Sequence, residues 1–219
     1  MRALILVDLQ YDFMPGGALA VPDGDAVVAV ANRLMPHFDL VVGTQDWHPP
    51  NHGSFASQHK GHKPGDVIEL NGLRQILWPD HCVQHSEGAR LHHALHAGAI
   101  GKVIQKGTDP GIDSYSTFFD NAHRKDTGLA DYLRDKGASE IFLMGLATDY
   151  CVKFSALDAR KLSFDTRVIE DGCRGIDMNP GDIARTFGEM REAGAVIVRS
   201  SDLAAATTFK GVHTTQGAQ

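Results

Sequence analysis

Short apolar runs alternate with amphipathic segments along this chain of 219 residues, and this alternation constrains the fold more than any other feature. Continuous apolar runs of this kind are typical of strands that are buried on both faces of a sheet. They occupy residues 3–7, 40–42, 103–104, 141–146 and 195–198, and a more mixed run occupies 166–169. Helical patterns lie between them at 26–35, 128–136, 152–161 and 180–193. The sequence therefore predicts a parallel sheet with helices on both faces, a three-layer α/β/α domain.

Composition favours a single domain over residues 1–219, because no linker rich in Pro, Gly or Ser divides the chain. We expect the polar tail 210–219 to be flexible.

The net charge of -6 gives no reason to expect nucleic acid or membrane partners, and no apolar run is long enough to span a membrane. A small molecule is the expected partner, and the oligomeric state stays open, with a homo-oligomer as one option. Three widely spaced cysteines favour a reducing, cytoplasmic location.

Reactive side chains follow four of the predicted strands, at Asp8, Asp46, Lys106 and Cys151. Ligands bind beyond the carboxyl ends of the strands in an open parallel sheet, so we expect these four to meet in one crevice. Each alone has an ordinary explanation, as a helix cap, a surface lysine or a small buried filler. Together an acid, a base and a thiol are what nucleophilic catalysis requires. Asp8 can move the thiol proton, while Lys106 and the start of the following helix can favour the thiolate.

A candidate metal site lies in a histidine-rich stretch of the chain. Asp46 and His48 alternate along an extended segment and can therefore grip one ion, with His81 as a third ligand. A carboxylate with two imidazoles suits one zinc ion, with iron or manganese as alternatives, and leaves coordination positions open. The neighbouring histidines that could compete for the ion, or simply face solvent, are His52, His59, His62 and His85.

Five short segments carry a more specific signal. They are Asp8-Leu9-Gln10-Tyr11-Asp12-Phe13, Thr44-Gln45-Asp46-Trp47-His48-Pro49, Trp78-Pro79-Asp80-His81-Cys82-Val83, Lys106-Gly107 with Asp113-Ser114-Tyr115-Ser116, and 145–152 around Cys151. In this order, over essentially the whole chain, the sequence resembles the nicotinamidase/pyrazinamidase family of isochorismatase-like hydrolases. The resemblance implies a six-stranded parallel sheet. It also implies hydrolysis of nicotinamide to nicotinate and ammonia in NAD salvage through a cysteine thioester, and of pyrazinamide to pyrazinoate.

The resemblance also implies roles for individual residues. The catalytic triad maps onto Asp8, Lys106 and Cys151. The metal ligands map onto Asp46, His48 and His81, with the ion contacting the pyridine nitrogen of the substrate directly or through water. The oxyanion hole maps onto the N–H groups of Ala147 and Cys151, after a cis peptide bond between Leu146 and Ala147. The substrate ring would lie among Phe13, Trp78 and Tyr115. Some family members recruit a further histidine from the loop after Asp-x-His, so a fourth protein ligand stays open.

Three other functions were weighed against this one. Isochorismate hydrolysis on the same fold needs neither a cysteine nor a metal, and hydrolysis of carbamoyl or ureido compounds needs no metal, so Cys151 and the metal-binding residues weigh against both. A metal-binding or thiol redox protein without turnover would leave Asp8 and Lys106 without a purpose. Ammonia release from nicotinamide, compared with N-carbamoyl substrates, distinguishes the hydrolases.

Overall fold

Six parallel strands form the central sheet of the computed structural model, which describes residues 1–207. The strand order is β5-β2-β1-β6-β7-β8. Their bounds are β1 Arg2–Val7, β2 Leu40–Asp46, β5 Lys102–Lys106, β6 Glu140–Leu146, β7 Asp165–Arg174 and β8 Val196–Val198. Each strand contains or overlaps one of the six predicted runs, which confirms the predicted sheet. The predicted flexible tail 210–219 lies outside the described residues.

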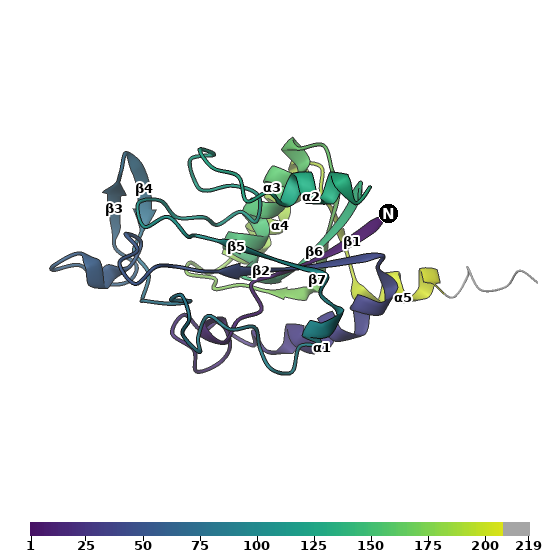
Figure 1. The fold of residues 1–219 in the computed structure, drawn as a ribbon, viewed down its shortest axis with the longest axis horizontal. Helices are drawn as coiled ribbons and strands as arrows, with labels where there is room; N and C mark the ends of the chain where they lie inside the picture. Colours follow the sequence, from purple (N-terminus) through teal and green to yellow (C-terminus); the bar gives the residue numbers. More distant parts are fainter. Residues whose placement is uncertain (208–219) are drawn as a thin grey trace, which may run out of the picture.

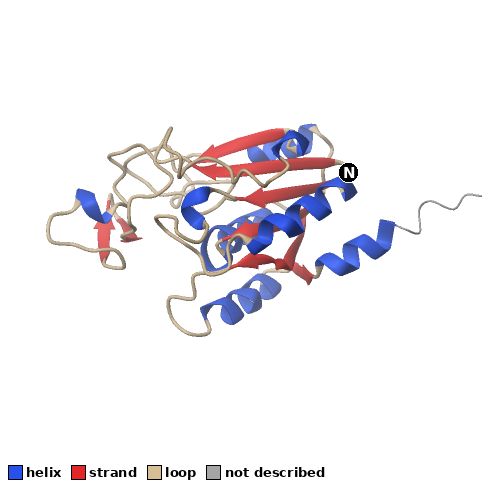
Figure 2. Ribbon diagram, turned by 90° about the horizontal axis from the view of Figure 1, so that it is seen from below, coloured by secondary structure: helices blue, strands red, loops and turns tan. Residues whose placement is uncertain are grey.

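Helices cover both faces of this sheet (Figures 1 and 2), which confirms the three-layer architecture. One face carries α1 Ala26–Leu34 and α5 Ser200–Thr207. The other carries α2 Leu129–Asp135, α3 Lys153–Lys161 and α4 Asp182–Glu192. A π-helical turn, Thr148–Val152, joins β6 to α3. No helix among residues 1–207 combines the length and the apolar character needed to cross a membrane.

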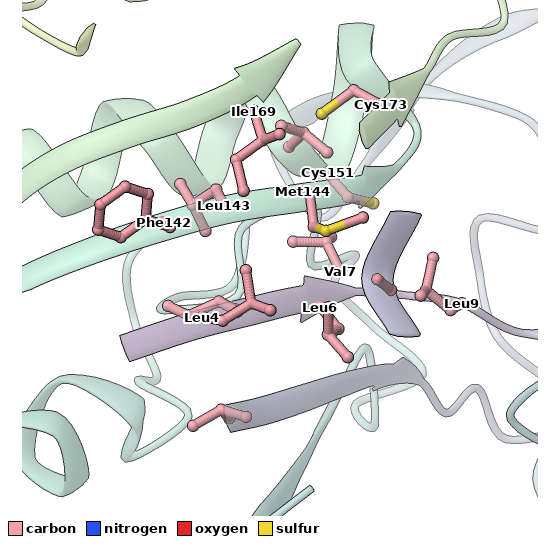
Figure 3. Packing of buried hydrophobic residues seen from close by; sticks show 14 of the residues in the cluster. Leu4, Leu6, Val7, Leu9, Phe142, Leu143, Met144, Cys151, Ile169 and Cys173 are labelled. Atoms are coloured by element: carbon pink, nitrogen blue, oxygen red, sulfur yellow. The ribbon is translucent and has the colours of Figure 1, made fainter. Parts of the chain in front are cut away.

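The two central strands are buried because their side chains are apolar on both faces of the sheet. Residues 3–7 of β1 and 141–144 of β6 are at most 1% exposed. Figure 3 shows Leu4 and Val7 beside Phe142 and Met144 of the neighbouring strand, with Cys151 where this core ends. Full burial of one such aliphatic side chain contributes about 1.5–3 kcal/mol. The core therefore fixes the positions of the strand ends that follow it.

The chain changes direction at the centre of the sheet. From β1 it moves outward to β2 and β5, and then returns to β6 on the other side of β1 before it reaches β7 and β8. Ligands of open α/β sheets bind at such a switch point, beyond the carboxyl ends of the strands. Asp8 follows β1 at this point and the π-helical turn follows β6. The topology thus places the candidate site between the ends of β1 and β6.

A small hairpin lies beyond the same end of the sheet, far from the N-terminus (Figure 1), and sequence analysis missed it. Its strands are β3 Val67–Leu70 and β4 Leu73–Ile76. Asn71 and Gly72 between them have φ of 51° and 83°. An Asn-Gly pair with positive φ is the preferred two-residue hairpin turn, so the sequence carried a signal for this hairpin. The helix α5 was missed as well.

Candidate active site

The ammonium group of Lys106 lies among the other three strand-end side chains. Its Nζ is 2.9 Å from Asp8 Oδ2, 2.5 Å from Asp46 Oδ1 and 3.4 Å from Cys151 Sγ. A further hydrogen bond of 3.0 Å reaches the carbonyl oxygen of Ser114. Lys106 ends β5 and pairs in register with Asp46, which ends β2. The structure therefore brings together an acid, an ammonium group and a thiol, all of them buried.

Asp8 is held in place by a threonine of the neighbouring strand. Thr44 Oγ1 donates a hydrogen bond of 2.6 Å to Asp8 Oδ1, and the Asp8 N–H donates to the same hydroxyl at 3.2 Å. Gly145 lets β6 approach closely here, because a Cβ at that position would lie 2.1 Å from the carbonyl oxygen of Val7. One oxygen of Asp8 is thus fixed by Thr44, while the other faces Lys106.

Burial dominates the electrostatics of the thiol. It raises the pKa of Cys151 well above its ordinary value, and the nearby ammonium of Lys106 only partly opposes this effect. The carboxylates of Asp8 and Asp46 raise the pKa further. Lys106 acts in the predicted direction, because its ammonium lowers the pKa of the thiol, but burial outweighs it. These effects favour the neutral thiol, from which a base must remove the proton before the sulfur can attack a carbonyl.

The turn that carries this cysteine begins with a cis peptide bond between Leu146 and Ala147, as the resemblance implied. The π-helical turn Thr148–Val152 follows directly. Ala147 and Cys151 both line the cavity beside the thiol. Their backbone N–H groups are candidates for an oxyanion hole on this ground.

The candidate metal ligands share a common arrangement of hydrogen bonds. His48 Nδ1 lies 2.9 Å from the carbonyl oxygen of Gly107, and His81 Nδ1 lies 2.8 Å from that of Pro79. Each ring then has its Nε2 directed at Asp46 Oδ2, at 3.8 Å and 3.9 Å. A backbone carbonyl on the far nitrogen is the usual support of a metal-binding histidine. The three ligand atoms lie within 4.8 Å of one another.

The charges of these groups suit a cation. Burial lowers the pKa of both His48 and His81, which favours the neutral imidazole that binds metals. Burial also raises the pKa of Asp46 to about 8, although Lys106 opposes the shift. A buried carboxylate whose charge is only partly compensated is stabilised by a bound cation. The donor set therefore fits a divalent ion.

The other histidines of this stretch are not part of the group formed by Asp46, His48 and His81. His52 is buried and forms a second group with His48 and Asp113, all within 4.8 Å, but that group includes neither Asp46 nor His81. Its Nδ1 is 2.7 Å from the hydroxyl of Ser54. Within residues 1–207, no group of metal-binding side chains contains any of His59, His62 and His85.

Aromatic side chains enclose a small cavity beside Cys151. The three that the resemblance implied, Phe13, Trp78 and Tyr115, all line it. Trp78 Nε1 donates a hydrogen bond of 3.2 Å to the Tyr115 hydroxyl. Sequence analysis missed four further lining residues, which are Leu19, Asp113, Tyr150 and Ile176.

Several supporting residues were also missed. Gln10 Oε1 accepts a hydrogen bond of 2.8 Å from the Asp46 N–H, and its Nε2 donates to the Asp46 carbonyl at 2.7 Å. Gln10 stands two residues after Asp8, and Thr44 two residues before Asp46. Side chains two apart on a strand share a face, so the spacing of Thr44 and Asp46 in β2 was a usable signal. The Asp149 carboxylate accepts from the Ile176 N–H at 3.0 Å, and nothing in the local sequence pattern predicts that contact.

Comparisons with known proteins agree with this geometry. The isochorismatase domain family matches residues 2–202. A nicotinamidase from Escherichia coli is 56% identical over 205 residues, 92% of this chain and 96% of that protein. The structure of an Acinetobacter nicotinamidase and pyrazinamidase superimposes with a TM-score of 0.89 at 45% identity, covering 92% of this chain and 97% of that one. A Pyrococcus horikoshii pyrazinamidase, solved in complex with zinc, gives a TM-score of 0.73 at 38% identity over 90% of this chain and 98% of that one.

Proposed function

This chain belongs to the isochorismatase family, and from its similarity to nicotinamidases we propose that it is a nicotinamidase, which hydrolyses nicotinamide to nicotinate and ammonia in NAD salvage. Pyrazinamide, which gives pyrazinoate, is a second proposed substrate, because similar proteins carry the pyrazinamidase name. One observation carries the proposal above all others: the Lys106 ammonium contacts Asp8, Asp46 and Cys151 at once. Cytoplasmic location and oligomeric state stay predictions.

In the proposed mechanism, Asp8 removes the proton from the Cys151 thiol, and the sulfur attacks the carboxamide carbon. The Lys106 ammonium stabilises the thiolate as it forms, at a distance of 3.4 Å. The N–H groups of Ala147 and Cys151 donate to the developing oxyanion. Asp8 then returns the proton to the amide nitrogen, the C–N bond breaks and ammonia leaves. Water attacks the resulting thioester with Asp8 as base, so that nicotinate leaves and the thiol is restored.

A divalent ion, zinc by preference, would be held by Asp46, His48 and His81. This proposal is supported by the donor set and by the zinc complex of the Pyrococcus horikoshii pyrazinamidase. When bound, such an ion supplies a Lewis acid that can hold the pyridine nitrogen and orient the ring. Phe13, Trp78 and Tyr115 would then pack against the ring. We do not assign His52 as a fourth ligand, because it groups with Asp113 rather than with Asp46.

An assay of ammonia release tests this function. The purified, zinc-loaded protein should release ammonia and nicotinate in equal amounts from nicotinamide. N-carbamoyl substrates should give far lower rates, because they have no pyridine nitrogen for the proposed metal ion to hold. Ammonia from N-carbamoyl compounds alone, with no nicotinate from nicotinamide, would reject the proposal in favour of a carbamoyl hydrolase.

A further inference from the structure

The cavity beside Cys151 is too small for a substrate ring in this conformation. Its volume is about 20 Å³, little more than one water molecule requires. A pyridine ring with its carboxamide is several times larger. Part of the wall must therefore move each time substrate enters or product leaves.

Two tyrosines separate this inner cavity from a larger outer one. Tyr115 and Tyr150 line both the inner cavity and an outer cavity of about 260 Å³. Tyr150 is half-buried and packs edge-on against Trp78, with 5.0 Å between ring centroids. Its hydroxyl donates to Met178 Sδ at 3.1 Å, and a thioether is a weak acceptor. Because Met178 is 45% exposed in a surface segment, Tyr150 is the more loosely held part of the wall.

The outer cavity combines aromatic faces with three cationic side chains and two acidic ones, Asp149 and Asp182. Phe154 is 37% exposed and stacks on Tyr115 with ring centroids 5.4 Å apart. The cationic side chains in the lining are Arg74, Lys153 and Arg185. Lys153 is paired with Glu189 at 2.7 Å, and Arg185 is paired with Asp182.

Arg74 is the exception among these cations. It projects from β4 of the hairpin and is exposed, and no carboxylate in the described part of the chain forms an ion pair with it. An exposed guanidinium beside aromatic rings is suited to an aromatic carboxylate, through charge and through stacking. Under the proposed function, the substrate is neutral and the product is such a carboxylate.

We propose that the outer cavity is a second binding site, for small aromatic carboxylates, in which Arg74 receives nicotinate after it passes Tyr150. The inference rests on the proposed function, since it takes the product of that reaction as the ligand. The neutral amide gains nothing from the charge of Arg74. The site therefore distinguishes product from substrate by charge alone.

Product inhibition tests the second site. In the cysteine mechanism nicotinate is the last product to leave and rebinds free enzyme, so at the active site it only competes with nicotinamide. Nicotinate in the outer cavity would also bind while the active site is occupied, and would block the exit. We therefore expect mixed inhibition of the wild-type enzyme. Arg74→Ala should raise the uncompetitive inhibition constant about threefold or more, and Arg74→Glu should raise it further.

The other constants supply the internal controls. The competitive constant, KM for nicotinamide and kcat should change less than about twofold in Arg74→Ala, since this exposed side chain does not line the inner cavity. Arg191→Ala removes an exposed arginine of α4 that lines neither cavity, and should leave both inhibition constants unchanged. High salt should weaken the uncompetitive component.

Two results would overturn the inference while leaving the function intact. One is purely competitive inhibition of the wild-type enzyme. The other is an uncompetitive constant in Arg74→Ala equal to that in Arg191→Ala. A wild-type protein that forms no nicotinate from nicotinamide would instead reject the proposed function, and the inference with it.

Discussion

Replacing Thr44 with valine isolates the role of one hydrogen bond in the proposed triad. The Thr44 hydroxyl donates to Asp8 Oδ1 at 2.6 Å and accepts from the Asp8 N–H at 3.2 Å. Valine has nearly the same shape, so the substitution removes these contacts without opening a cavity. The hydroxyl lies outside the lining of the inner cavity and does not touch the reacting atoms. Thr44 is therefore a positioning residue, and its effect should pass through Asp8.

The magnitude follows from the type of bond. A hydrogen bond to a charged group contributes about 1.5–3 kcal/mol. At about 1.4 kcal/mol per tenfold change, the loss of kcat/KM should be about 10- to 150-fold if the bond acts fully on the transition state. The decrease should lie mainly in kcat, because the substrate does not contact Thr44.

Thr166→Val is the matched control. Thr166 is a buried threonine of β7 whose hydroxyl donates to the Phe164 carbonyl at 3.0 Å, away from the site. Both variants should lose free energy of unfolding in urea titrations, Thr44→Val the more because its partner is a carboxylate, while only Thr44→Val should lose activity. If Thr44→Val keeps kcat within twofold of the wild type, the orientation of Asp8 does not limit the reaction.

The remaining predictions concern the nucleophile, the metal site and the buried thiols. Cys151→Ala should abolish ammonia release and leave nicotinamide binding by calorimetry within a few-fold; residual turnover would rule out the thioester. Gly107→Ala should weaken zinc binding at least about tenfold in chelator competition, because the new Cβ would clash with the His48 ring, 2.4 Å from its Cε1. Gly61→Ala shares the positive φ without the clash and should bind zinc normally. Burial raises the pKa of Cys173 to about 12, so the folded state keeps a proton that the unfolded state loses above about 9. The stabilisation that the protonated Cys173 thiol gives the folded state is fully present below pH 9 and is lost as the pH rises toward 12. Between pH 8 and 10 the wild type should lose about 1.4 kcal/mol more unfolding free energy than Cys173→Ala, and equal losses would contradict the shift.

The predicted strands and their polar ends came from patterns that are local in sequence. Apolar runs that end in Asp8, Asp46 or Lys106 indicate a buried strand. They also place these polar residues at the carboxyl ends of the parallel strands, where ligands bind. The hairpin was missed although Asn71-Gly72 carried its signal, because the surrounding segment is polar and short of periodicity.

Other parts of the site depend on contacts that no local pattern encodes. The resting state of Cys151 is set by how completely the folded chain removes it from water, and a sequence motif does not measure burial. Tyr150 and Ile176 reach the cavity from a π-helical turn and from a segment beyond β7, where neither helical nor strand periodicity applies. Their positions follow from tertiary contacts, such as the hydrogen bond from the Ile176 N–H to Asp149.

Asp46 joins the proposed catalytic and metal-binding groups in one electrostatic unit. Its Oδ1 contacts the Lys106 ammonium, and its Oδ2 faces the Nε2 atoms of His48 and His81. Asp8 and Asp46 share a single buried ammonium beside a neutral thiol, so the site without an ion has an excess of negative potential whenever both carboxyl groups are ionised. That excess raises the pKa of the thiol, as burial also does, and thus opposes formation of the thiolate. A cation held by Asp46 would offset this excess. It would therefore favour the Cys151 thiolate as well as orient the substrate ring.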